Sequence, residues 1–275
     1  MKIADETIVS IITLLSDFGL KDPYVAEMKA IILSIHPQAR VVDITHEIEK
    51  FNIRMGAFVL ASATTYFPPG TIHVAVVDPG VGTKRRPIIV ETKRSYYVGP
   101  DNGLLMLAVQ KEGVGHVYYV NNPQYMLPRV SRTFHGRDIF APVAAHLARG
   151  RSPSEFGSEI QDYDLPEFAK PHVGASELLG EVLHIDDFGN IISNISAEDL
   201  EKMGIREGGS LRVKLDGKTL TVKLCSAYGE VPAKTPLAII GSNDFLEISI
   251  NQGSASRTFE TKIGDPLRVS LASSN

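Results

Sequence analysis

The chain has 275 residues, of which 43% are hydrophobic and 22% charged, a mix typical of globular proteins. Its formal net charge of −4 disfavours a nucleic-acid binder, because such proteins usually carry a basic surplus that meets phosphates. The single cysteine, Cys225, cannot form an internal disulfide, and the sequence has no C-x-x-C pair for zinc. The apolar run near the N-terminus is too short to span a membrane. We therefore expect a cytoplasmic protein with no membrane segment and no metal.

The first half of the chain alternates strand and helix patterns. In chain order we expect a strand at 8–15, a helix at 23–35, a strand at 40–44, a helix at 52–66, strands at 72–77, 87–92 and 96–98, a helix at 103–110, a strand at 117–120 and a helix at 137–148. This alternation predicts an α/β domain over residues 1–165, with a largely parallel sheet flanked by helices.

The pattern changes after residue 165. Pro166, Pro171 and Gly174 punctuate a polar stretch, which predicts a linker over 166–177. From 178 to 275 the chain is rich in strands, with period-two alternation at 211–215 and 218–222 on either side of the hairpin signal Asp216-Gly217. Further strands are expected at 236–241, 246–250 and 266–271, and Ser196 can cap a short helix. We expect a smaller β-domain here.

Polar loops follow two predicted strands of the α/β half, where open parallel sheets bind their ligands. Asp17 comes directly after an apolar strand and could accept hydrogen bonds from the vicinal hydroxyls of a sugar, or could be a turn residue. Asp78 begins the turn Asp78-Pro79-Gly80-Val81-Gly82, across which Arg85 could face it as a buried ion pair. The other interpretation of this turn is a surface loop with a basic tip.

A third loop, Thr133-Phe134-His135-Gly136-Arg137-Asp138, precedes a predicted helix. His135 is the side chain best suited to proton transfer near neutral pH, although a lone histidine is often structural. Gly136 would let a substrate approach the backbone closely, and Asp138 could cap the helix. Two of these loops resemble kinase motifs, but their order is wrong. P-loop, G-x-G-x-x-G, H-E-x-x-H and G-x-S-x-G patterns are all absent.

Two turns of the β-domain carry further candidates for ligand contacts. Asp186-Asp187-Phe188-Gly189-Asn190 interrupts a strand pattern, and its Asn190 amide could hydrogen-bond an adenine edge while Phe188 stacks on a ring. Gly241-Ser242-Asn243-Asp244-Phe245, which leads into a strand containing Glu247, raises the same question. Both segments could equally be plain β-turns.

Taken together, six motifs resemble one family. They are Asp17-Phe18-Gly19, Val77-Asp78-Pro79-Gly80-Val81-Gly82, Gly99-Pro100-Asp101-Asn102-Gly103, Thr133-Phe134-His135-Gly136-Arg137-Asp138, Asp187-Phe188-Gly189-Asn190 and Asn251-Gln252-Gly253-Ser254-Ala255. In this order they resemble the S-adenosyl-L-methionine (SAM) hydroxide adenosyltransferases, relatives of the fluorinating and chlorinating enzymes. The resemblance implies a β-barrel-like C-terminal domain and a homotrimer with active sites at its subunit interfaces.

The resemblance also implies roles for single residues. Asp78, Arg85 and His135 match the catalytic set, with Arg86 the alternative to Arg85, and Asp17 matches the carboxylate that holds the ribose hydroxyls. The remaining substrate-binding positions are Phe51, Asp186, Phe188, Asn190, Tyr228, Ser242, Asn243 and Glu247. Asp186 and Ser242 match contacts to the methionine amino group, whereas Asn190 and the Tyr228 backbone match contacts to adenine. Asn243 stands where the halogenating relatives have an arginine that binds the methionine carboxylate. The residue that makes this contact here is therefore left open.

The expected activity is attack of an activated water on ribose C5′ of SAM, which yields adenosine and methionine without a cofactor. The halogenating relatives have a tyrosine at the position of Asp78 and lack the Asp-Arg-His set, whereas this chain keeps all three residues. The alternatives are therefore SAM-dependent halogenation and a non-catalytic sensor of adenosine or SAM.

Overall fold

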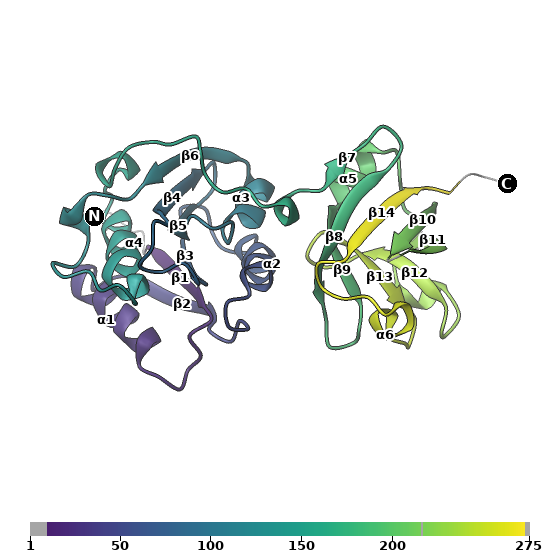
Figure 1. The fold of residues 1–275 in the computed structure, drawn as a ribbon, viewed down its shortest axis with the longest axis horizontal. Helices are drawn as coiled ribbons and strands as arrows, with labels where there is room; N and C mark the ends of the chain where they lie inside the picture. Colours follow the sequence, from purple (N-terminus) through teal and green to yellow (C-terminus); the bar gives the residue numbers. More distant parts are fainter. Residues whose placement is uncertain (1–9, 216, 273–275) are drawn as a thin grey trace, which may run out of the picture. The chain divides into compact units, whose positions relative to one another are not determined.

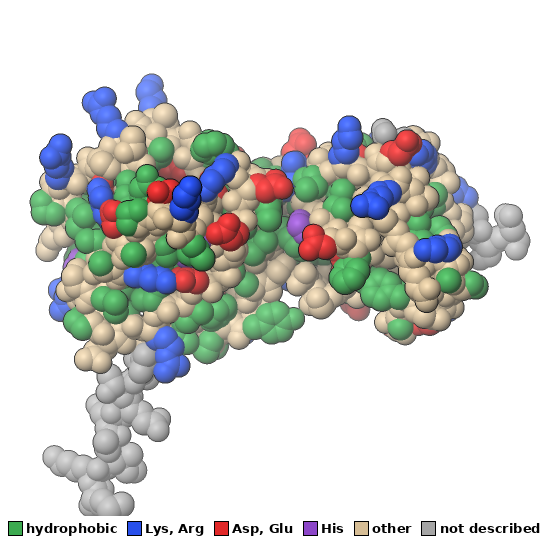
Figure 2. All heavy atoms as spheres, turned by 90° about the horizontal axis from the view of Figure 1, so that it is seen from below, with side chains coloured by type: hydrophobic (Ala, Val, Ile, Leu, Met, Phe, Trp, Pro, Cys, Tyr) green, Lys and Arg blue, Asp and Glu red, His purple; other side chains and the backbone are tan. Residues whose placement is uncertain are grey.

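The chain forms two compact units, Met1–Pro166 and Glu167–Asn275, each with its own hydrophobic core (Figure 1). The computed structural model describes residues 10–215 and 217–272. Residues 8 and 9 of the first expected strand, and Asp216 of the expected hairpin, lie outside these ranges. On the face drawn in Figure 2, acidic and basic side chains are interspersed, in keeping with the small net charge of −4. None of the helices in the described part of the chain is long and apolar enough to cross a membrane.

The first unit alternates strands and helices as its hydrophobic pattern predicts. Its elements are β1 (Ile11–Ser16), α1 (Tyr24–Ile35), β2 (Arg40–Thr45), α2 (Ile53–Thr64), β3 (Ile72–Val76), β4 (Pro87–Thr92), β5 (Tyr96–Pro100), α3 (Met106–Glu112), β6 (Val114–Tyr119), η1 (Pro123–Tyr125), η2 (Gly136–Phe140), α4 (Ala141–Ala148) and η3 (Pro153–Glu155). Asn52 caps α2, because its side chain accepts a hydrogen bond from the Met55 N–H at 2.9 Å.

The six strands of this unit form one sheet in the order β2-β1-β3-β5-β4-β6. Only β4 runs against the others, so the prediction of a largely parallel sheet is confirmed. Helices α1 and α4 pack together on one face, and α2 and α3 pack together on the other (Figure 1). Because helices cover both faces, the central strand β3 is buried along its whole length. Because β1 and β3 are parallel neighbours, their carboxyl ends lie side by side.

The second unit is a closed β-barrel. Its elements are η4 (Glu167–Ala169), β7 (His172–Val173), β8 (Leu178–Ile185), β9 (Ile191–Ser196), α5 (Ala197–Lys202), β10 (Ser210–Leu215), β11 (Lys218–Cys225), η5 (Tyr228–Glu230), β12 (Pro236–Ile240), β13 (Phe245–Ile250), α6 (Ala255–Phe259) and β14 (Pro266–Leu271). The sheet order β14-β10-β11-β12-β13-β9-β8 closes through pairing of β14 with β8, which removes the free sheet edges. Ser196 caps α5 through a reciprocal capping box with Asp199.

Some boundaries differ from the sequence-based expectation. The helix expected at 137–148 begins one residue earlier and as a π-helical turn, η2, which hydrophobic periodicity alone does not distinguish from an α-helix. The expected linker at 166–177 contains η4 and β7, and β7 pairs with β8. The strand pattern around the turn at 186–190 corresponds to β8 and β9, whose bounds could not be set from the sequence. In them Val182 and Leu183 are both buried, and so are all of Ile191–Ile195, which breaks the alternation expected of a half-exposed strand.

A buried histidine sits in the sheet of the first unit. His73 on β3 is fully buried, its Nδ1 lies 2.8 Å from the Thr13 hydroxyl, and the rings of Phe67 and Tyr97 flank it. Burial, with a smaller contribution from the charge of Arg94, lowers the pKa of His73 to about 3. His73 is therefore neutral in the folded protein throughout the physiological range.

This burial predicts a pH dependence of stability. Between pH 6.5 and about 3 the unfolded chain binds a proton at His73 that the folded chain does not, so the free energy of unfolding falls as the pH falls. In that window one such group contributes a slope of about 1.4 kcal/mol per pH unit. We expect His73→Asn to weaken the dependence of the free energy of unfolding on pH in that window. Urea unfolding, followed by circular dichroism between pH 7 and pH 4, measures this dependence. Equal slopes for the two proteins would contradict this assignment.

Candidate active site

A cavity of about 270 Å³ lies at the carboxyl ends of β1 and β3 and brings the three sequence-selected loops together. All of its lining residues belong to the first unit, namely Asp17, Phe18, Asp22, Tyr24, Lys50, Phe51, Val76, Asp78, Val81, Thr133, Phe134, His135 and Gly136. The sequence analysis singled out Asp17, Phe51, Asp78 and His135 correctly as neighbours. It missed Tyr24 and Lys50, which no motif marks.

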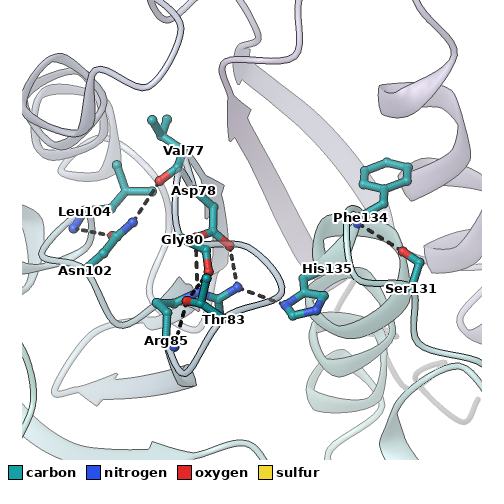
Figure 3. A network of polar contacts seen from close by, with 10 residues as sticks. All are labelled: Val77, Asp78, Gly80, Thr83, Arg85, Asn102, Leu104, Ser131, Phe134 and His135. Carbon is teal, nitrogen blue, oxygen red and sulfur yellow. Dashed lines mark hydrogen bonds and ion pairs between the residues drawn. The ribbon is translucent and has the colours of Figure 1, made fainter.

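Arg85 joins Asp78 to His135 (Figure 3). Its Nε donates to Asp78 Oδ1 at 3.1 Å, and its Nη2 donates both to Asp78 Oδ2 and to His135 Nδ1, the latter at 2.9 Å. The side chains of Arg85 and Asp78 are only 7% and 5% exposed, so the ion pair is largely shielded from water. A bidentate pair in such surroundings fixes the orientation of both groups.

The contact with Arg85 also sets the protonation of His135. A guanidinium can only donate hydrogen bonds, so Nδ1 of His135 accepts, and the proton of the neutral ring lies on Nε2. Burial, and then the charge of Arg85, lower the pKa of His135, while the carboxylates of Asp78 and Asp138 and a hydrogen bond to the Ser131 backbone oppose the shift. His135 is therefore a neutral imidazole whose single N–H lies on Nε2.

Arg86 points to a different set of partners. Its guanidinium binds Asp101 at 2.7 Å and Asp162 at 3.1 Å. It donates to neither Asp78 nor His135, so of the two adjacent arginines it is Arg85 that the turn directs towards the cavity.

Local backbone chemistry explains why the turn after β3 holds this geometry. The Asn102 amide donates to Val77 O at 2.9 Å, and the Thr83 hydroxyl donates to Gly80 O at 2.7 Å (Figure 3). Gly82 has a φ of +74°, and a Cβ there would lie 2.2 Å from the carbonyl oxygen of Arg132. Only glycine therefore allows the turn to pack against the loop that carries His135.

The loop after β1 adds Asp17 to the cavity lining. The residue is 6% exposed, and its Oδ2 accepts the backbone N–H of Phe51 at 2.9 Å. The Lys50 ammonium also donates to the Asp17 carbonyl. Phe51 adopts a left-handed conformation with a φ of +66°, which is strained for a non-glycine residue, and its ring is 67% exposed. Strain of this kind at a cavity wall is typical of a ligand contact.

Gly136 lines the cavity and is also closely packed, because a Cβ there would lie 3.2 Å from both Met28 and Phe134 and 3.3 Å from Phe18. Close approach of a substrate to its backbone stays a prediction. Asp138 lies in the first turn of η2 but makes no capping hydrogen bond. Its buried carboxylate accepts hydrogen bonds from the Ser131 N–H and from Arg137 Nε, both at 2.7 Å, and so closes the loop.

The candidates on the second unit form a separate polar cluster. Asp186 accepts hydrogen bonds from the backbone and side-chain amides of Asn190 at 2.8 and 2.9 Å, and Tyr228 donates to Glu247 at 3.0 Å. Burial raises the pKa of Glu247, and burial together with Glu247 raises the pKa of Tyr228 to about 12. The ring of Phe188 is 80% exposed.

Ser242 and Asn243 lie in the turn between β12 and β13, and Glu247 lies on β13, the strand that follows this turn. In the described part of the chain, no group of three or more His, Cys, Asp or Glu side chains is arranged to hold a metal ion.

Comparison with known proteins gives this arrangement its context. The family models for the N-terminal and C-terminal domains of SAM hydroxide adenosyltransferases match residues 12–157 and 180–268. The chain belongs to this family. An (R)-S-adenosyl-L-methionine hydrolase of Thermus thermophilus is 39% identical over 93% of this chain and 97% of its own length.

More distant relatives include a fluorinase of an Actinoplanes species, which is 30% identical over 95% of this chain and 98% of its own length. The crystal structure of an uncharacterized conserved protein from Thermotoga maritima superposes with a TM-score of 0.82 at 39% identity, covering 94% of this chain and 99% of that one.

The Arg85 contact makes a prediction about His135 that is independent of turnover. Removing the positive charge in Arg85→Met should raise the pKa of His135, because only burial then opposes the carboxylates of Asp78 and Asp138. The matched Arg86→Met should leave it unchanged, since Arg86 binds Asp101 and Asp162 instead. Histidine ¹⁵N NMR titration, with His135→Gln to assign the signal, measures both. A wild-type signal from the Nδ1–H tautomer would contradict the geometry.

Proposed function

We propose that this chain hydrolyses SAM to adenosine and L-methionine by direct attack of water on ribose C5′. The observation that carries the proposal is the buried Asp78-Arg85-His135 network, which shares one cavity with the carboxylate of Asp17. Asp17 would accept hydrogen bonds from the ribose 2′- and 3′-hydroxyls, while the network faces the carbon that reacts. The hydrolases among the relatives support the same activity.

In the reaction the C5′–S bond breaks as a C5′–O bond forms, and water loses one proton. The sulfonium is a good leaving group, so the main task is to orient the water and to remove its proton. Each Asp78 oxygen keeps a second lone pair beside the Arg85 contact, so Asp78 can accept that proton. His135, whose Nδ1 is occupied, acts through its Nε2–H as a donor that orients the water oxygen.

The charge of the site favours water over a halide ion. The Asp78 carboxylate is negative and shielded from solvent, so it would repel an anion bound next to it. The Nε and Nη2 N–H groups of Arg85, which could otherwise bind an anion, already donate to Asp78. A neutral water that gives up its proton to the carboxylate suits this arrangement better.

We further propose that the protein works in the cytoplasm as a homotrimer, without cofactor or metal. The adenine and methionine contacts predicted for Asp186, Phe188, Asn190, Tyr228, Ser242, Asn243 and Glu247 all lie on the second unit. None of them lines the cavity of the first unit. The family resemblance supports supply of the second unit by a neighbouring subunit.

The direct experiment is incubation of the purified protein with SAM in halide-free and halide-containing buffer, followed by chromatography. We expect adenosine and methionine in both buffers. A 5′-halo-5′-deoxyadenosine formed only with halide would place the chain among the halogenating enzymes. Tight binding of SAM without any product would instead make it a sensor.

The proton-acceptor role of Asp78 is tested by Asp78→Asn, which keeps a side chain that can contact Arg85. We expect turnover to fall by about 10²–10⁴-fold, the usual contribution of a general base, while adenosine affinity stays within a few fold. Asp162→Asn is a matched control, because Asp162 binds Arg86 at an exposed site. Steady-state kinetics and calorimetry separate the two effects. Normal turnover of the Asp78→Asn protein would refute this role.

A further inference from the structure

A chain of polar contacts runs from the surface of α1 to the loop that carries Asp17. Lys29 Nζ lies 2.6 Å from Asp43 Oδ2, Asp43 Oδ1 lies 3.2 Å from His46 Nε2, and His46 Nδ1 lies 2.7 Å from Ser16 Oγ. Ser16 and His46 are only 1% and 3% exposed, so this end of the chain of contacts is buried. None of these residues lines the cavity.

The donors and acceptors along this series can be assigned. With the His46 proton on Nε2, facing Asp43, Nδ1 accepts the hydroxyl proton of Ser16. The oxygen of Ser16 is then available to accept the Phe18 N–H, which lies 3.3 Å away. The Ser16 hydroxyl is thus held on both sides, by the His46 ring and by the Phe18 N–H, and hydrogen bonds between buried groups of this kind fix side-chain orientation. The orientation of the Ser16 hydroxyl thus depends on His46.

His46 holds the Asp17-Phe18 pair from both sides. Its ring contacts Ser16, which precedes the pair, and its carbonyl accepts the Gly19 N–H at 2.7 Å, which follows the pair. The segment that starts at His46 then adds the contact of the Phe51 N–H with the Asp17 carboxylate. The position of the Asp17 carboxylate is therefore set largely by residues 46–51.

An Asp-His-Ser series could also indicate a nucleophilic serine. Here the Ser16 hydroxyl is buried, lies outside the cavity lining and is held between the Phe18 N–H and His46. A substrate carbon cannot reach it, so the series acts on geometry and not on covalent chemistry.

We propose that His46 is a positioning residue for substrate binding, which acts through Ser16 to hold the Asp17 carboxylate where it receives the ribose hydroxyls. This inference rests on the proposed function, because it assumes that Asp17 binds a ribose diol. It assigns His46 no contact with the substrate or with the reacting atoms.

The test compares adenosine with 2′,3′-dideoxyadenosine, which lacks the two hydroxyls, by calorimetry at neutral pH. Wild-type protein should prefer adenosine by at least about tenfold, as expected for hydrogen bonds to a charged carboxylate. Asp17→Asn should lose most of this preference. We expect His46→Ala, and the milder Ser16→Ala and His46→Asn, to reduce the preference severalfold and to raise KM for SAM more than they lower kcat.

His73→Asn is the matched control, because His73 is an equally buried histidine that pairs with a hydroxyl in the same sheet, away from the cavity. It should lower the melting temperature and leave the adenosine preference unchanged. An unchanged preference in folded Ser16→Ala and His46→Asn would overturn the positioning role while leaving the hydrolase proposal intact. If the wild type shows no preference and no turnover, the proposed function itself fails, and the inference fails with it.

Discussion

The candidate site depends on one guanidinium. Arg85 holds Asp78 through two hydrogen bonds and His135 through a third, and these two partners come from loops 57 residues apart (Figure 3). Without it, the shielded carboxylate of Asp78 and the half-buried imidazole of His135 would lose the hydrogen bonds that orient them. With it, the carboxylate stays charged and oriented, and the imidazole keeps its proton on Nε2. The rest of the first unit, from the parallel sheet to the close contact at Gly82, serves to bring Arg85 to this position.

Much of this arrangement could be predicted from the sequence. The apolar strands ending before Asp17 and Asp78 indicate a parallel sheet, and the ends of parallel strands are where ligands bind. The glycines of the turn after β3 indicated an unusual backbone, and Gly82 has a positive φ with almost no space for a side chain. The family resemblance added His135, which no local pattern distinguishes from a structural histidine.

Other features could not be predicted because they depend on tertiary packing. The choice between Arg85 and Arg86 is decided by which way successive side chains point after the turn, and the carboxylates of Asp101 and Asp162 draw Arg86 away. Gly136 lines the cavity, and its close packing against Met28, Phe18 and Phe134 could not be predicted from the sequence. The series through His46 joins Lys29 of α1, Asp43 of β2 and Ser16 at the end of β1, so no sequence motif contains it.

The account's central claim is that a water molecule attacks ribose C5′ beside Asp78. Hydrolysis of SAM in ¹⁸O-labelled water, with mass analysis of the adenosine product, tests it most directly. The account predicts that one ¹⁸O is incorporated at the 5′-hydroxyl, both with and without halide in the buffer. Adenosine without the label, or a 5′-halo product that forms in its place when halide is present, would contradict it.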